Sequence, residues 1–325
     1  MMRPKSALYY IEDLERIALD VTELIEKESD PSGQLDIIKM CQKYSLEAVA
    51  YIFLGSRLGT LSGGGDGQRL IEIADAIGPT SQKLIFLPLS SLKYLPEYKR
   101  WIKLLEEDFD ICEKHVKNAI ATSTEDSETI IAKLHRRCGQ DSVIPTVMGI
   151  DALNAGIDTT GTAATFLLYH LATNPEKQET LYQEICDTIG PSGHLSEAAL
   201  AKMRYMKAVQ MESQRILPSV WGTSRVFDKD ITVNGYNIPA GTTVIRVGAF
   251  SAMDPENFTE PEKFHPERWL RNHADRHQAD SFANLPFGHG ARFRIQRERE
   301  RETLYIFIFL GPVLVRGSPG WSSSC

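Results

Sequence analysis

Apolar residues recur every three or four positions over most of the chain, which is the spacing of α-helices with one buried face. A first helix is predicted from Tyr10 to Glu28, where Ile11, Leu14 and Ile17 begin such a face. The same periodicity predicts further helices in residues 35–54, 69–77, 98–122, 126–138, 175–189 and 204–217, with a short one after Ser196. Residues 61–68 contain consecutive glycines but lack the lysine of a phosphate-binding loop, so we interpret them as a flexible connector.

The segment Pro145–Thr173 is predicted to form the longest helix, apolar on nearly every side and therefore buried. At about 1.5 Å per residue it is about 43 Å long, enough to cross a whole domain. Its middle reads Ala155-Gly156-Ile157-Asp158-Thr159-Thr160. An acid and an alcohol are costly in such a helix unless both have partners, and a threonine that bonds back one turn can bend it. We expect a kink or widened turn from Gly156 to Thr159, which is either a polar notch for a small ligand or a satisfied polar kink between packed helices.

Beyond residue 222 the hydrophobic period changes from that of a helix to that of a strand. Ile231-Thr232-Val233 and Tyr236-Asn237-Ile238 flank Asn234-Gly235, a strong signal for a two-residue hairpin turn. A further strand is predicted from Thr242 to Val247. We therefore expect a mainly α protein with a small antiparallel β-sheet, which is an α+β fold.

Composition narrows the class of function without naming one. Hydrophobic residues make up 42% of the chain and charged residues 24%, as in globular proteins that bury a core. A net charge of -7 argues against a general nucleic-acid-binding surface, and five cysteines without a CxxC pair argue against a disulfide framework. The N-terminus is unlike a signal or transit peptide, and the most apolar run, residues 303–315, is too short to cross a membrane. We expect no targeting or membrane-spanning segment.

Two further motifs carry charged groups. Glu212 and Arg215 are three residues apart and share one face of a helix, where such a pair usually lies in solvent. Arg268, within Phe264-His265-Pro266-Glu267-Arg268-Trp269, could add a second guanidinium and make a rigid ionic clasp. Downstream, Leu285-Pro286-Phe287-Gly288-His289-Gly290-Ala291-Arg292 has two glycines that permit close approach to a flat ligand, and Arg292 could meet an anionic group.

Taken together and in this order, these motifs resemble those of the cytochrome P450 superfamily, and the run Leu167–Pro175 favours its mitochondrial type. The resemblance implies a partial cytochrome P450 fold with heme b as the cofactor. It implies that Asp158 and Thr159 relay protons to iron-bound dioxygen and that Ala155 and Gly156 border the oxygen groove.

The remaining motif residues match structural and heme-binding positions of the same family. Glu212, Arg215 and Arg268 match a structural clasp behind the heme. The heme loop is matched by Phe287, Gly288, Gly290 and Arg292, in which Phe287 packs beneath the ring and Arg292 pairs with a propionate. Arg225 occupies a second basic position near a propionate.

Partners and location also follow from the resemblance. A lipophilic small molecule is the implied substrate, a ferredoxin is the implied electron donor, and nucleic acid is not implied. Lys207 matches a ferredoxin-contacting lysine, whereas the companion position is Met211, so this patch is incomplete. The implied location is the matrix side of the mitochondrial inner membrane, with peripheral membrane association left open.

The chain departs from the family pattern after Phe293. Arg294 stands where the family has the cysteine that binds the iron, and Gln296 stands where it has a glycine. An arginine cannot donate a lone pair to iron, because it stays protonated. We expect residues 1–293 to form a partial cytochrome P450 domain without its N-terminal β-region and first helices, and residues 294–325 to form a divergent, poorly ordered tail.

Three hypotheses of function follow. The first is a heme-thiolate monooxygenase that inserts one oxygen atom from dioxygen into a lipophilic substrate. The second is a catalytically defective cytochrome P450 fragment that cannot bind heme iron because of Arg294. The third is a non-enzymatic helical interaction module.

Overall fold

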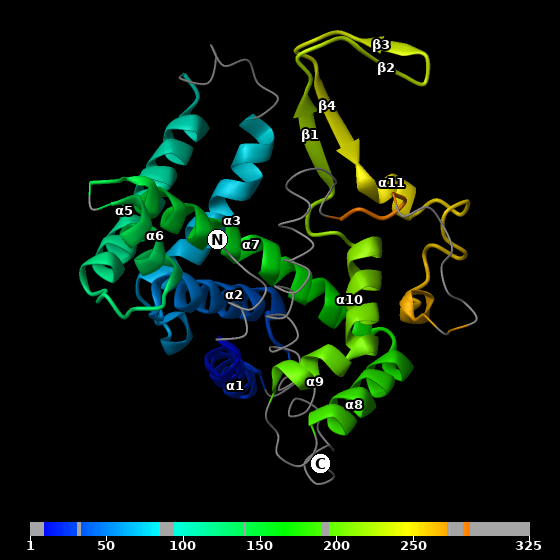
Figure 1. Cartoon of the computed structure of the whole chain (residues 1–325), viewed down its shortest axis with the longest axis horizontal. Helices are drawn as coiled ribbons and strands as arrows, with labels where there is room; N and C mark the ends of the chain where they lie inside the picture. The colour runs from blue at the N-terminus through cyan, green and yellow to red at the C-terminus, as the bar shows by residue number, and fades with distance from the viewer. Residues whose placement is uncertain are drawn as a thin grey trace. The chain divides into compact units, whose positions relative to one another are not determined.

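A computed structural model describes residues 10–30, 34–84, 94–139, 141–189, 195–271, 273 and 282–286 (Figure 1). These residues are mostly helical and contain two small antiparallel sheets, so the predicted fold class is confirmed. They divide into two compact units, one that ends at Thr162 and one that begins at Ala163. The long helix α7 (Ile144–Ala172) contributes residues to both units.

The unit up to Thr162 is a helical bundle around one apolar core. Its elements are α1 (Ile11–Glu28), α2 (Ile37–Leu54), the 3-10 helix η2 (Thr60–Ser62), α3 (Asp66–Leu84), α5 (Pro96–Ala121), α6 (Ile130–Cys138) and the first part of α7. Helix α2 packs against α1, α3, α5 and α6, and thirteen of its residues are buried. The core includes Leu46, Phe53, Leu70, Val116 and Leu153. The apolar residues of this core recur along each helix every three or four positions, and this periodicity is the signal from which the helices are predicted.

The unit from Ala163 onward combines helices with the sheets. Its further elements are α8 (Pro175–Ile189), α9 (Glu197–Lys202), α10 (Arg204–Ile216), β1 (Gly222–Val226), β2 (Ile231–Val233), β3 (Tyr236–Ile238), β4 (Thr243–Val247), α11 (Gly248–Ala252) and the 3-10 helix η4 (Pro266–Trp269). Helix α10 contacts α8, α11 and η4. The Ser196 side chain caps α9 by accepting from the Ala199 N–H, as its sequence position predicts.

The predicted hairpin is confirmed, and the predicted single sheet is in fact two. Strands β2 and β3 pair antiparallel, and their turn residues Asn234 and Gly235 have φ of 48° and 84°. Positive φ at both positions is what a type I′ turn requires, which explains the Asn-Gly pair. Strand β4 pairs instead with β1, with Ser224 opposite Ile245. Figure 1 shows β1 and β4 side by side, with the β2–β3 hairpin extending beyond them.

Helix α3 is longer than the sequence predicts. The pattern indicates residues 69–77, but the helix begins at Asp66, inside the predicted connector, and continues through Pro79 to Leu84. Proline lacks the N–H that would bond to the carbonyl four residues earlier. The hydroxyls of Thr80 and Ser81, which follow the proline, bond to the carbonyls of Ala76 (3.0 Å) and Ile77 (2.9 Å) in the preceding turn. Packing of α3 on α5 outweighs the local penalty.

Helix α7 differs from its prediction in two respects. It is helical at every residue from Ile144 to Ala172, so no widened turn interrupts it. It is also not buried on every side, because Asp151, Asn154, Asp158 and Thr159 form an exposed stripe. Spacings of three and four residues place these polar side chains on one face. The high average hydropathy of the segment hides that stripe.

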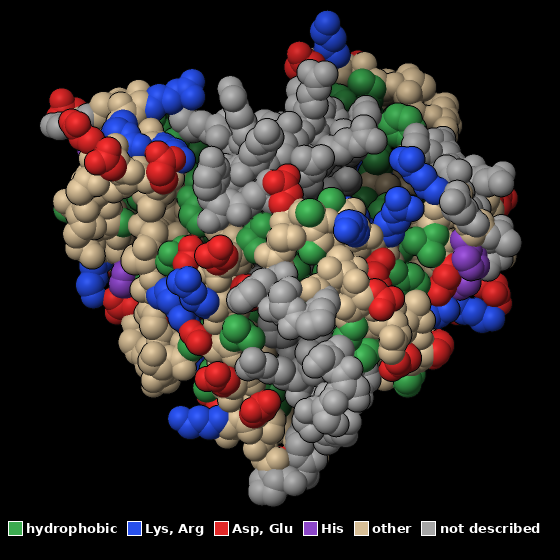
Figure 2. All heavy atoms as spheres, turned by 60° about the horizontal axis from the view of Figure 1, so that its bottom comes forward, with side chains coloured by type: hydrophobic (Ala, Val, Ile, Leu, Met, Phe, Trp, Pro, Cys, Tyr) green, Lys and Arg blue, Asp and Glu red, His purple; other side chains and the backbone are tan. Residues whose placement is uncertain are grey.

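No helix in the described part of the chain is long and apolar enough to cross a membrane. Figure 2 shows Lys and Arg side chains interspersed with Asp and Glu over the face that it draws. The predicted tail, residues 294–325, lies outside the described residues.

Candidate functional site

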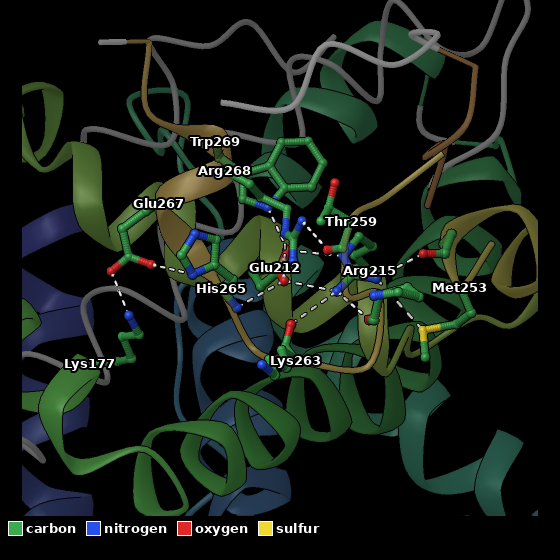
Figure 3. A network of polar contacts seen from close by, with 12 residues as sticks. Lys177, Glu212, Arg215, Met253, Thr259, Lys263, His265, Glu267, Arg268 and Trp269 are labelled. Atoms are coloured by element: carbon green, nitrogen blue, oxygen red, sulfur yellow. Dashed lines mark hydrogen bonds and ion pairs between the residues drawn. The ribbon is translucent and has the colours of Figure 1, made fainter. Parts of the chain in front are cut away.

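Glu212 lies at the centre of a buried ionic clasp. Helix α10 places Glu212 and Arg215 one turn apart, and both side chains are 0% exposed. Arg215 donates from Nε to Glu212 Oε2 (3.0 Å) and from Nη2 to Oε1 (2.8 Å), so the pair is bidentate. Arg268 of η4 donates from Nε to Oε1 (3.0 Å) and is 4% exposed. The structure thus brings together three residues that span more than fifty positions of sequence (Figure 3).

Two further groups donate hydrogen bonds to the Glu212 carboxylate, and neither was predicted from the sequence. Trp269 donates from its indole nitrogen to Glu212 Oε2 (2.8 Å), and the backbone N–H of His265 donates to Oε1 (3.0 Å). The Phe258 ring lies 5.0 Å from the Arg215 guanidinium carbon and 6.0 Å from that of Arg268. A tryptophan directly after the arginine was the available signal for the indole bond. Phe258 gave no such signal, because its place beside the arginines depends on the folded chain.

Both guanidinium groups of the clasp also donate hydrogen bonds to backbone carbonyls. Arg215 donates from Nη1 to the Ala252 carbonyl (2.8 Å) and from Nη2 to the Pro261 carbonyl (2.7 Å). Arg268 donates from Nη1 to the Thr259 carbonyl (3.1 Å). Buried guanidinium groups are tolerated only when their N–H donors are satisfied in this way. The clasp therefore ties the segment 252–268 to α10.

A second carboxylate, Glu267, links the same turn to α8 and α10. Its Oε1 accepts from Lys177 Nζ (3.0 Å) and from the Tyr205 hydroxyl (2.9 Å), and His265 Nδ1 lies 3.3 Å from Oε2 (Figure 3 shows the Lys177 and His265 contacts). Burial acts to raise the pKa of Glu267, but the bonds from Lys177 and Tyr205 outweigh it and lower the pKa. Burial and the bond to Glu267 raise the pKa of the Tyr205 hydroxyl. The arrangement holds an ionised Glu267 beside a neutral tyrosine.

The acid–alcohol motif of α7 has partners in α2 and in its own helix. Thr159 donates its hydroxyl to the Ala155 carbonyl (2.7 Å), and Ser45 donates its hydroxyl to the Gly156 carbonyl. Asp158 Oδ1 lies 3.5 Å from Gln42 Nε2. Partial burial raises the pKa of Asp158, the Gln42 bond opposes this rise, and the charge of Asp75 adds to it.

Gly156 is needed where it stands because α2 approaches α7 closely. A β-carbon at Gly156 would lie 2.5 Å from Val49 Cγ1, closer than real contacts allow. Ala155, Asp158 and Thr159 are exposed, whereas Gly156 is half-buried. In this structure Gly156 therefore serves the packing of two helices, and the role of the motif as an oxygen groove stays a proposal.

The other predicted residues are not part of the clasp. Lys207 is exposed on α10, on the same face as Arg204 and Met211. Arg225 is exposed on β1 and donates to the Ser224 carbonyl (2.7 Å). The remaining residues of the predicted heme loop lie outside the described residues: Phe287, Gly288, Gly290, Arg292 and Arg294.

The described fold and the clasp define a mainly helical protein in which one buried carboxylate joins two arginines. Residues 1–293 match the family model for cytochrome P450, and the chain belongs to this family.

Relatives of the mitochondrial type are similar to the chain over nearly all of its length. It is 30% identical over 317 residues to probable cytochrome P450 12a5, mitochondrial, of Drosophila melanogaster, covering 90% of this chain and 59% of that protein. It is 30% identical over 319 residues to 25-hydroxyvitamin D-1 alpha hydroxylase, mitochondrial, of Rattus norvegicus, covering 91% and 63%. It is 29% identical over 316 residues to sterol 26-hydroxylase, mitochondrial, of Homo sapiens, covering 90% and 58%. The chain thus spans about three fifths of the length of the curated relatives it matches.

Cytochrome P450s bind heme iron through a cysteine thiolate. From the sequence, Arg294 is expected at that ligand position, and an arginine, which offers no lone pair, does not fit it; the family match ends one residue earlier, at residue 293. Burial, with the nearby charge of Asp108, raises the pKa of the Cys112 thiol, so this core cysteine is not a thiolate. Within the described residues no group of three or more His, Cys, Asp or Glu side chains could hold a metal ion.

Proposed function

We propose that the described helices are the scaffold of a heme-thiolate monooxygenase of the mitochondrial type. The reaction class is insertion of one oxygen atom from dioxygen into a lipophilic substrate, with electrons from a ferredoxin. The observation that carries the proposal is the Glu212 clasp, which rigidly joins α10 to η4 through two arginines. The match to the cytochrome P450 family and the mitochondrial names of similar proteins support it.

The proposed electron donor would dock on the exposed face of α10. Arg204 and Lys207 are both exposed there, and Met211 follows one turn later. A ferredoxin with an acidic surface would meet two positive charges beside an apolar side chain. Rim charges of this kind act mainly on the association rate and on its salt dependence. The location that goes with this partner is the matrix side of the mitochondrial inner membrane.

Arg294 favours a second candidate function: a cytochrome P450 chain that is catalytically inactive. A thiolate ligand donates electron density to the iron, so its absence removes the chemistry and not only the affinity. On this reading the chain keeps the clasp and the helical core but does not catalyse the reaction of its family. Asp158 and Thr159 would then have no proton-transfer role.

The absorption spectrum of the reduced, carbon monoxide-bound protein separates the two candidates. We would express the full chain, the Arg294→Cys variant and the Arg294→Cys/Gln296→Gly variant with added heme, and measure bound heme in each. We expect the thiolate band only in the double variant, because the loop needs both the sulfur and the glycine. A thiolate band from the unmodified chain would refute the inactive reading. Absence of the band from the double variant would refute the proposal that this scaffold supports heme-thiolate chemistry.

A further inference from the structure

One buried amide lies between two carboxylates that come from different helices. Gln42 of α2 is 6% exposed, and its Nε2 lies 3.0 Å from Asp75 Oδ1 of α3 and 3.5 Å from Asp158 Oδ1 of α7. Both aspartates are exposed to solvent on their other sides. The two N–H bonds of one amide nitrogen can therefore serve one carboxylate each.

Helix packing keeps the amide in this position. A β-carbon at Gly161 would lie 3.2 Å from the Gln42 α-carbon, so α7 rests directly on the backbone of α2 at this residue. One turn further along α2, the Ser45 hydroxyl bonds to the Gly156 carbonyl. The carbonyl oxygen of the Gln42 side chain is buried and has no partner in the described part of the chain. Turning the amide over would place that oxygen against two negative charges, which favours the orientation seen.

No lysine, arginine or histidine among the described residues forms an ion pair with Asp75 or Asp158. Lys43, the neighbour of Gln42, is paired with Glu28 at 3.2 Å. A negative charge on Asp75 opposes ionisation of the Asp158 carboxyl, because the two carboxylates share one neutral donor and like charges repel.

We propose that Gln42 and Asp75 are positioning residues for Asp158: the amide orients its carboxyl, and the Asp75 carboxylate places a like charge beside it. The pKa of Asp158 agrees with this geometry. Partial burial raises it, the hydrogen bond from Gln42 lowers it, and the charge of Asp75 raises it.

The test is a carbon-13 NMR titration of the side-chain carboxyls in the full chain labelled at aspartate, with Asp158→Asn used to assign the signal. Asp75→Asn should move the Asp158 midpoint to lower pH, because it removes the opposing charge. Gln42→Leu should move the midpoint to higher pH, because it removes the donor that favours the ionised form. Asp151→Asn is the matched control on α7, removes an equal charge two turns away, and should leave the midpoint nearly unchanged.

Opposite shifts in the two variants support the proposal, since a merely structural role would not give them. Shifts of the same sign, or no shift beyond that of the control, would overturn it.

Discussion

Removing the Glu212 carboxylate should be among the most destabilising single changes in the chain. The side chain is 0% exposed and accepts from Arg215 (3.0 and 2.8 Å), Arg268 (3.0 Å), the Trp269 indole (2.8 Å) and the His265 N–H (3.0 Å). Glu212→Ala leaves two guanidinium charges buried without their counter-ion. Breaking a buried pair from one side costs about 3–5 kcal/mol, a large part of the about 5–15 kcal/mol by which whole proteins are stable.

Arg268→Ala should cost less than Glu212→Ala, because Arg215 still neutralises the carboxylate. Loss of hydrogen bonds to a charged group predicts about 1.5–3 kcal/mol for it. The two changes should not add, because each removes the same bond, and a double variant should show a coupling energy of about 0.5–3 kcal/mol.

The measurement is the free energy of unfolding from urea titrations followed by circular dichroism at neutral pH. Glu212→Gln, which keeps the shape of the side chain, serves where the alanine variant does not accumulate. The matched control is Glu113→Gln, which breaks the helical pair between Lys117 and Glu113 (2.9 Å, side chains 64% and 31% exposed) and should cost about 0–1 kcal/mol. If Glu212→Ala lowered the free energy of unfolding no more than this control, the clasp would not stabilise the fold.

Glu184→Ala should lower the free energy of unfolding by about 1–2 kcal/mol in urea titrations, because its carboxylate accepts from three N–H groups at the start of α10 (2.8, 2.7 and 2.8 Å). Gly156→Ala should cost about 1–3 kcal/mol through its clash with Val49, and Val49→Ala should restore part of that loss; absence of rescue would contradict the close-packing explanation. Burial, with Arg215 nearby, lowers the pKa of His170 below its ordinary 6.5 despite the charge of Glu212. The unfolded chain therefore takes up the proton first, so stability should be lost as pH falls below about 6.5, and His170→Phe should flatten that dependence in urea titrations repeated across pH.

Local features of the fold could be predicted from the sequence because they depend on neighbours in the chain. The helical period identifies α1, α2, α7 and α10 to within a few residues, because apolar side chains recur every three or four positions in each of them. The hairpin follows from Asn234-Gly235, because few other pairs accept positive φ at both positions. The spacing of Glu212 and Arg215 places them on one helical face, and their contact follows from that.

Arrangements between distant segments were decided only by the tertiary structure. The pairing of β4 with β1, the indole bond of Trp269 to Glu212 and the passage of α3 through Pro79 depend on packing, which local spacing does not encode. The exposed stripe of α7 was missed because an average over the segment conceals four polar side chains on one face. The bridge from Asp75 through Gln42 to Asp158 had no sequence signal at all, because its three residues come from three helices. A carboxyl's charge state depends on what lies within a few ångströms of it, and only the folded chain decides that.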